Sequence, residues 1–243
     1  MLLVKPFGLA ILLAAFFLVP QSRASNIVLD FSNSSNPNGV WTYLYNTSPT
    51  TETAFTASQA TTFETLPEWY NGQGEPDAIY MVNNNSGSTV SYLTINDPTG
   101  VLWLDPEEYG VAVEFTAPTT GTYNIVGNFL GIDTGENSHP VEILENGSTV
   151  VYSNMISRYG EDDAFNLSGA FALPLSAGDT ITFFVGTGST GCTYCNLSTG
   201  LDGMITLATP EPASLFVCAA ALTLMVFCGR RRLQARQRTG ASR

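Results

Sequence analysis

Short runs in which apolar and polar residues alternate, separated by turn-forming residues, constrain the fold of this chain more than any other feature. In residues 110–117, Val111, Val113 and Phe115 fall on one side of an extended chain, a pattern typical of a strand with one buried face. Turn-forming residues follow at 118–121, and 122–131 predicts the return strand. Further strands are predicted at 26–31, 40–45, 54–57, 79–82, 89–95, 141–144, 149–152, 165–175, 180–185 and 203–207.

The residues between these runs favour a purely β fold. Asn146-Gly147 is the strongest short hairpin signal in the chain, and Pro67 and Gly72 help to predict a long loop over 66–78. No stretch of the central sequence shows a convincing amphipathic helical pattern. Short strands with a turn about every ten residues are typical of a β-sandwich, so the sequence predicts an all-β sandwich.

The N-terminus has the layout of a secretory signal peptide. Lys5 supplies a positive charge, residues 7–19 form an apolar run, and Ser22 and Ala24 place small residues where signal peptidase cleaves. The apolar run is too short to span a membrane comfortably. We therefore expect cleavage after Ala24, with an uncleaved N-terminal anchor as the alternative.

The C-terminus predicts a membrane anchor. Pro210, Glu211 and Pro212 precede an apolar segment, 213–229, that would form a helix of about 25 Å, the short limit for a membrane span. A cluster of positive charges follows it, which marks the cytoplasmic side because arginine is costly to bury in hydrocarbon. The cluster consists of Arg230, Arg231 and Arg232.

This order of Pro-Glu-Pro, short span and arginine cluster at the C-terminus resembles the PEP-CTERM sorting signal of bacterial surface and exopolysaccharide-associated proteins. The resemblance covers residues 209–238. It implies that Pro210, Glu211 and Pro212 are the recognition site of an exosortase, a membrane transpeptidase-like enzyme, and that the tail is removed. An ordinary single-pass anchor is the alternative.

These features divide the chain into four parts. We expect a signal peptide at 1–24, a β-sandwich ectodomain at 25–208, a sorting signal with a transmembrane helix at 209–232, and a basic cytoplasmic tail at 233–243. The protein would be held in the inner membrane with its ectodomain outside, and after processing would reach the cell surface or the extracellular space.

The expected ectodomain is strongly acidic. Of the 21 Asp and Glu residues of the chain all but Glu211 lie within 25–208, whereas of the nine Lys and Arg residues only Arg158 does. Binding of DNA or RNA depends on basic side chains that neutralise phosphates. Nucleic acid is therefore excluded as a partner, and divalent cations such as calcium are the natural counterions of such a surface.

The second half of the ectodomain, 111–207, also resembles the jelly-roll modules of exported bacterial surface proteins and of some carbohydrate-binding modules. This resemblance rests on turn and core positions, so it implies a jelly-roll-like sandwich and says little about a ligand. Its segments are 115–118, 121–123, Asn146-Gly147, 177–181 and 201–203.

Cys192 and Cys195 form a Cys-x-x-Cys pair in a loop rich in Gly, Thr and Ser. A thioredoxin-type site needs a helix N-terminus to lower the thiol pKa, and a zinc site needs two more ligands at suitable spacing; the sequence offers neither. In an exported protein the favoured interpretation is a local disulfide that shapes the loop.

The sequence predicts no catalytic group. His139 is the only histidine, and no nucleophile motif accompanies it, so we expect it to be either a residue at the start of a strand or a hydrogen-bonded surface residue. Carboxyl groups are too numerous for a pair suited to glycoside cleavage to be chosen. Two acidic clusters are calcium candidates, with a solvated loop as the alternative for each: Asp133, Glu136 and Asn137, and Glu161, Asp162 and Asp163.

Aromatic residues give the best indication of ligand binding, because sugar rings stack on aromatic faces while Asp and Asn bind the hydroxyls. The first choice is Trp69, Tyr70 and Asn71 in the predicted loop, with core packing as the alternative for each ring. The other aromatic candidates are Trp41, Trp103, Tyr109, Tyr159 and Tyr194.

The sequence thus predicts an exported, non-catalytic surface or matrix protein that associates with exopolysaccharide, with calcium as a candidate cofactor. Two alternatives stay open: a glycan-active hydrolase or lyase on a jelly-roll scaffold, and a purely structural adhesin. Signal peptidase and an exosortase are the expected processing partners.

Substitution of the sorting motif tests the C-terminal prediction. In cells that export the protein, Glu211→Ala should leave full-length protein in the inner membrane, because the processing enzyme would lose its recognition site. Immunoblotting of membrane and released fractions measures this. Release of the variant at the wild-type level would contradict the prediction.

Overall fold

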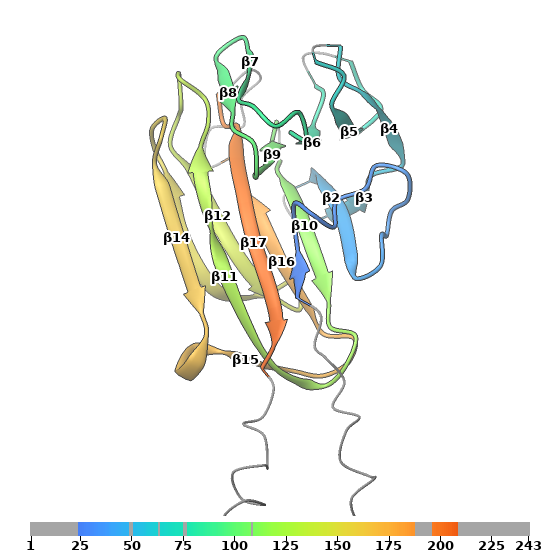
Figure 1. Ribbon diagram of the computed structural model, residues 1–243, viewed down its shortest axis with the longest axis vertical. Helices are drawn as coiled ribbons and strands as arrows, with labels where there is room; N and C mark the ends of the chain where they lie inside the picture. The colour runs from blue at the N-terminus through green and yellow to red at the C-terminus, as the bar shows by residue number, and fades with distance from the viewer. Residues whose placement is uncertain are drawn as a thin grey trace, which may run out of the picture. The chain divides into compact units, whose positions relative to one another are not determined.

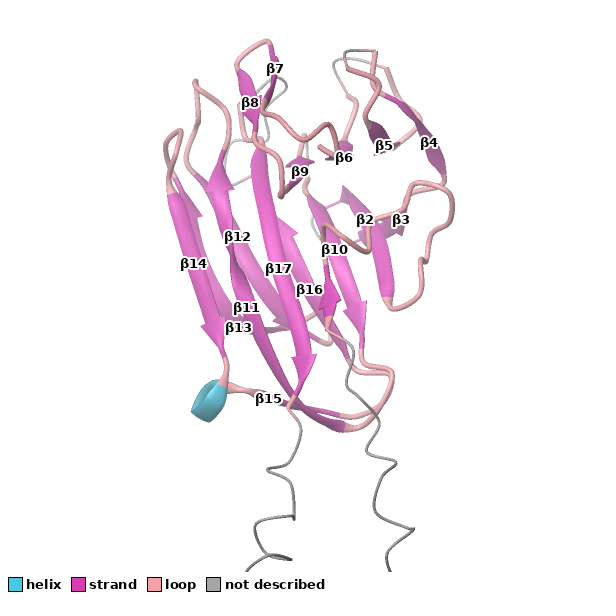
Figure 2. Ribbon diagram, viewed as in Figure 1, coloured by secondary structure: helices cyan, strands magenta, loops and turns pink. Residues whose placement is uncertain are grey.

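The computed structural model describes residues 24–48, 51–62, 64–74, 77–107, 109–187 and 196–208. The chain divides into two units, Met1–Leu207 and Ala208–Arg243, and the description below concerns the first. Its described residues form strands joined by loops and turns, together with one short 3-10 helix, η1, at Gly169–Phe171 (Figure 2).

Two sheets face each other to form a sandwich (Figure 1). The first has nine strands, in the order β14-β11-β17-β9-β6-β5-β4, with β1 added beside β17 and β15 beside β11. Their bounds are β1 Ser25–Asn26, β4 Ala57–Ala60, β5 Pro67–Tyr70, β6 Tyr80–Asn83, β9 Leu102–Asp105, β11 Gly121–Gly131, β14 Asp162–Leu167, β15 Leu173–Leu175 and β17 Thr199–Leu207.

The second sheet has six strands, in the order β13-β12-β16-β10-β2-β3. A separate hairpin, β7–β8, stands at one end of the sandwich (Figure 1). The bounds are β2 Trp41–Ser48, β3 Thr51–Ala54, β7 Val90–Tyr92, β8 Ile95–Asp97, β10 Val111–Thr116, β12 His139–Glu145, β13 Thr149–Ile156 and β16 Thr180–Val185.

The main core lies between the two sheets and is rich in aromatic residues. Phe115 of β10 meets Trp41 and Tyr123 edge to face, at centroid distances of 5.5 and 5.7 Å. Phe165 of β14 contacts Phe183 of the opposite sheet at 5.7 Å. Such pairs add to the free energy gained by burying the rings, and the predicted all-β sandwich is confirmed.

A second, smaller core forms on the outer side of the nine-stranded sheet. The β7–β8 hairpin packs there and covers apolar side chains that point away from the main core. Gly200 of β17 lets this core close, because a Cβ atom at that position would lie 2.9 Å from Cγ2 of Val101. The buried members of the small core are Leu66, Val82, Val90, Ile95, Trp103 and Ile132.

Several predicted strands match the structure and others do not. The hairpin at Asn146-Gly147 joins β12 to β13, with Asn146 at φ +51° and Gly147 at φ +68°. The loop predicted over 66–78 is wrong in its first part, which is β5, and the strand predicted over 89–95 is instead the tight β7–β8 hairpin. In both places the strands are three or four residues long, too short for alternation to show.

Other boundaries also differ from the sequence prediction. The first strand ends at Asn26, and the run 165–175 is split between β14, η1 and β15. β9 was not predicted, because its residues Leu102, Trp103 and Leu104 are all buried and give no alternating pattern. Among the described residues no helix is long and apolar enough to span a membrane, and the predicted signal peptide and anchor lie outside them.

Asp97, at the end of β8, is a buried acid. It is 1% exposed, and neither of its carboxyl oxygens meets a hydrogen-bond partner among the described residues. Desolvation by burial raises the pKa of Asp97 to about 8. The carboxyl group therefore retains its proton at neutral pH in the folded chain, which reduces the cost of its burial.

This proton makes stability depend on pH. From about pH 4, the ordinary range of an aspartate, up to about pH 8, the folded state holds a proton that the unfolded state has lost. The free energy of unfolding should therefore fall as pH rises through this window. Asp97→Asn removes the titrating group, so it should raise the melting temperature relative to wild type more at pH 8 than at pH 4.

Calorimetry at the two pH values measures the difference. Asp77→Asn, on an exposed loop, is the matched control for the loss of a solvent-exposed carboxyl group. An equal effect of Asp97→Asn at both pH values would contradict the account of a protonated buried acid.

Candidate functional site

A cleft of about 260 Å³ opens beside the β7–β8 hairpin. Its lining comes from β5, β6, β9, the hairpin turn and the segments around Asp133 and Asn196. Pockets that enclose a whole drug-sized ligand have volumes of about 300–1,000 Å³. This cleft is slightly smaller, so it suits one ring of a longer chain better than a whole oligosaccharide.

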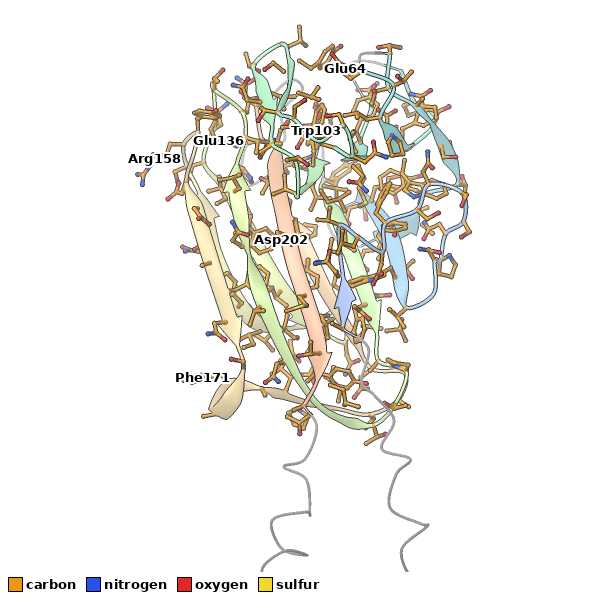
Figure 3. All side chains as sticks on the ribbon, in the orientation of Figure 1. Glu64, Trp103, Glu136, Arg158, Phe171 and Asp202 are labelled. Carbon is orange, nitrogen blue, oxygen red and sulfur yellow. The ribbon has the colours of Figure 1, made fainter. Side chains whose placement is uncertain are left out.

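Strand register explains the floor of the cleft. Glu68, Val82 and Trp103 stand side by side on β5, β6 and β9. Their chain neighbours Trp69 and Met81 point into the main core, and side chains alternate along a strand. The first three therefore occupy the outer face of the sheet. Figure 3 shows Trp103 on β9 below the hairpin.

The turn of the hairpin forms one rim. Tyr92 is 37% exposed and Leu93 is 86% exposed, and both line the cleft. Leu93 has φ +52°, a left-handed conformation that costs a residue with a Cβ atom roughly 1–2 kcal/mol. An apolar side chain held exposed in a strained turn is a common feature of ligand sites.

Four carboxyl side chains lie along the cleft, on Glu68, Asp105, Glu107 and Asp133. Neutral donors hold three of them. Gln59 Nε2 donates to Glu68 Oε1 at 2.6 Å, and Ser198 Oγ donates to Asp105 Oδ1 at 2.7 Å. Asp133 accepts from the Gly135 amide at 2.7 Å and from Thr94 Oγ1 at 3.0 Å. The described lining contains no Lys or Arg.

His139 lies behind the cleft and connects the two sheets. It is fully buried, with Nδ1 2.8 Å from Asn137 O and Nε2 2.7 Å from Thr199 Oγ1. Burial lowers the pKa of His139, so the neutral ring donates from Nδ1 to the carbonyl and accepts from Thr199. His139 begins β12, as the strand-entry alternative predicted, and the surface alternative does not apply, because the buried ring joins β12 to β17.

Glu136 lies next to this histidine, with Oε1 3.4 Å from His139 Nδ1. Desolvation by burial, together with the negative charges of nearby carboxyl groups such as Asp133, raises the pKa of Glu136 to about 8, although the hydrogen bond from the Asp133 amide acts in the opposite direction. The side chain is therefore held in its protonated form at neutral pH. Thr199, like His139, is 0% exposed, so this network is a structural link with no nucleophile open to solvent.

The first-choice sugar-binding residues, Trp69, Tyr70 and Asn71, do not line the cleft, whereas Trp103, one of the other aromatic candidates, does. Trp69 belongs to β5 and is 4% exposed; its Nε1 donates to Ser32 O at 2.8 Å and its ring stacks on Tyr43. Trp69 therefore packs in the main core, the alternative stated for each aromatic candidate. Tyr70 and Asn71 are half-buried and are not among the lining residues.

The first calcium cluster is largely hydrogen-bonded within the protein. Both oxygens of Asp133 accept hydrogen bonds, and Glu136 Oε2 accepts from the Asp133 amide at 3.2 Å. Asn137 is exposed, and its carbonyl contacts His139. A protonated Glu136 is also a poor ligand, because calcium prefers ionised carboxylates.

The second cluster has a similar arrangement. Glu161 Oε2 accepts from the Ser157 amide at 2.7 Å. Asp162 and Asp163 accept from Asn128 and Asn154 at 2.7 and 2.6 Å. No group of three or more His, Cys, Asp or Glu within the described ranges is arranged to hold a metal ion, and the calcium sites stay a prediction.

Other predicted site residues lie outside the described ranges, so their roles also stay predictions. They are the predicted disulfide pair Cys192 and Cys195, the sorting motif Pro210, Glu211 and Pro212, and the arginine cluster that would end the membrane span, Arg230, Arg231 and Arg232.

The sequence prediction missed the residues that do form the cleft. Trp103 was one of several aromatic candidates, but nothing in the sequence places it beneath a hairpin formed by residues 90–97. The sequence prediction placed Tyr92 and Leu93 within a single strand. In the structure the chain reverses there, between β7 and β8. A three-residue strand on each side of the turn is too weak a signal to reveal it.

Comparisons with known proteins give distant matches in structure alone. No family model matches the chain, and no curated protein matches it. Among solved structures, the CBM36-1 domain of a multidomain xylanase from the hindgut metagenome of Trinervitermes trinervoides is 14% identical, with a TM-score of 0.33. The match covers 54% of this chain and 97% of that one.

Two further matches are similarly remote. A family 35 carbohydrate binding module from Clostridium thermocellum is 15% identical over 48% of this chain and 84% of its own, with a TM-score of 0.30. CBM35 from Cellvibrio japonicus Abf62 is 12% identical over 70% of this chain and 94% of its own, with a TM-score of 0.31. At scores this low no ligand is transferred to this chain.

The strained turn can be tested by stability alone. Leu93→Gly should leave the melting temperature unchanged or raise it slightly, because glycine adopts a positive φ without a steric penalty. Leu93→Val should lower it, since a β-branched residue tolerates that conformation poorly. Calorimetry measures the melting temperatures of both variants. A glycine variant that melts clearly below the valine variant would contradict the backbone conformation described for Leu93.

Proposed function

We propose that this protein is an exported, surface-anchored, non-catalytic polysaccharide-binding protein. The observation that carries the proposal is the cleft beside the β7–β8 hairpin, where exposed Tyr92 and Leu93 share the lining with polar and acidic side chains. A sugar ring presents both kinds of surface, since its C–H face packs on apolar and aromatic side chains and its hydroxyls bind polar groups.

The polar groups of the cleft suit hydroxyl recognition. Asp105 and Glu107 provide carboxyl oxygens as acceptors, and Asn196 provides an amide with donors and an acceptor. Most of these side chains stand on or beside a rigid sheet whose other face is packed in the main core. A binding site supported in this way needs little reorganisation when a ligand enters, which lowers the entropic cost of binding.

The position of the cleft agrees with attachment at a chain end. Ser25 pairs with Ile205 near the end of β17, whereas the cleft adjoins the start of that strand at Ser198. In Figure 1 both described chain ends lie at the end of the sandwich away from the β7–β8 hairpin. The cleft and the end of β17 that precedes the C-terminal unit therefore lie at opposite ends of the same strand.

The proposal includes the route of the protein. Signal peptidase would remove residues 1–24, and an exosortase would act at Pro210, Glu211 and Pro212 after inner-membrane anchoring. The ectodomain would then reach the cell surface or the extracellular space and associate there with exopolysaccharide.

One observation supports a second candidate, a glycan-active hydrolase or lyase. Glycoside cleavage uses two carboxyl groups on either side of the scissile bond, and the cleft has four carboxyl side chains, on Glu68, Asp105, Glu107 and Asp133. The same glycans that test binding also test this candidate, since an enzyme would release shorter products that chromatography detects.

A glycan array probed with the full-length chain in mild detergent tests the binding proposal. For any glycan that binds, Tyr92→Ala should weaken affinity at least tenfold, a loss of about 1.4 kcal/mol, because the exposed ring no longer covers the sugar. Tyr159→Ala is the matched control, since Tyr159 is 50% exposed and lies outside the lining.

The control variant should bind as the wild type does. An array without any binding glycan would contradict the proposal and favour a purely structural adhesin. Equal binding by wild type, Tyr92→Ala and Tyr159→Ala would place the binding surface elsewhere and would also contradict it.

A further inference from the structure

The described lining of the cleft has four acidic side chains, on Glu68, Asp105, Glu107 and Asp133, and no Lys or Arg. Glu68, Asp105 and Asp133 accept hydrogen bonds from neutral donors. Arg158, the only Lys or Arg in residues 25–208, is exposed on the turn between β13 and β14. Figure 3 shows its side chain at the margin of the molecule, away from Trp103.

This charge distribution restricts which sugars can enter. Clefts lined by charges of one sign concentrate ligands of the opposite sign and repel those of the same sign. A polysaccharide of uronic acids would bring carboxylates next to Asp105 and Glu107 with no basic side chain between them. The chemistry of the lining therefore opposes acidic glycans and favours a ligand that carries positive charge.

The spacing of the acids favours an organic cation over a metal ion. They stand on separate elements, β5, β9, the segment after β9, and the segment after β11. Within the described ranges, no group of three or more potential ligands is arranged to hold a metal. A chain of sugar rings bearing amino groups can present positive charge to acids on several of these elements.

We propose that the cleft binds a glycan of hexosamines with free amino groups. This inference rests on the polysaccharide-binding function proposed above. Each such ring has a C–H face for the rim at Tyr92 and Leu93. Its ammonium group can donate charge-assisted hydrogen bonds to Asp105 or Glu107. The N-acetylated form of the same ring keeps its shape and loses the charge, so the two forms isolate the contribution of the ammonium group.

The test measures binding of the full-length chain in mild detergent to oligomers of β-1,4-linked glucosamine, of N-acetylglucosamine and of galacturonate. It is carried out at about pH 6, below the usual pKa of an amino group. The glucosamine oligomer should bind at least about tenfold more tightly than its N-acetylated form. The galacturonate oligomer should not bind, and added salt should reduce the preference for glucosamine.

Charge-neutral variants locate the effect. Asp105→Asn and Glu107→Gln, separately and together, should reduce the preference for glucosamine towards parity while affinity for the N-acetylated oligomer persists. Glu145→Gln, at the far end of β12 and outside the lining, is the matched control and should keep the full preference. Melting curves confirm that each variant is folded.

The outcomes separate this inference from the proposed function. Tyr92-dependent binding of neutral sugars without preference for glucosamine would overturn the inference and leave the binding function intact. No binding of any glycan, here or on the array, would contradict both. Equal loss of preference in Glu145→Gln, or equally strong competition by a simple polyamine such as spermidine, would show attraction by general charge and overturn the inference.

Discussion

The two-sided packing of β5, β6 and β9 is the constraint on which the site depends. One face of these short strands, with Trp69, Met81 and Leu104, is buried in the main core. The other, with Val82 and Trp103, is buried in the small core under the β7–β8 hairpin. Because both faces are packed, the strands cannot shift register without exposing apolar side chains, and the acids and aromatic residues beside them are held in place.

This packing also explains how far the sequence could predict the structure. Alternation of apolar and polar residues located β10, and a short run rich in apolar residues located β16. Both predicted strands match the observed bounds to within one residue. β9 is buried on both sides and β7 is three residues long, so neither shows a period. The first-choice binding residues were misplaced for another reason: the Gly- and Pro-rich segment that follows Trp69 suggested a loop, whereas Trp69 lies in β5 and packs against Tyr43.

The candidate site could not be found in the sequence because its residues come together only through the fold. Tyr92 and Asn196 are separated by more than a hundred positions and line the same cleft. The sequence already shows that residues 25–208 contain many acidic residues and a single basic one, Arg158. What the structure adds is that four of the acids share a cleft with no basic side chain in its described lining. Charge of one sign in a confined space is more selective than the same charge spread over a surface.

The central claim is that the cleft beside the β7–β8 hairpin binds a glycan, and a chemical-shift titration tests it most directly. Amide spectra of the isotopically labelled protein would be recorded while a binding oligosaccharide is added. The account predicts that shifts concentrate at Tyr92, Leu93 and Asn196 and spare Val126 and Met204 on the outer face of β11 and β17. Shifts confined to the part of the sheet around Val126 and Met204, with the β7–β8 hairpin signals unchanged, would contradict the account.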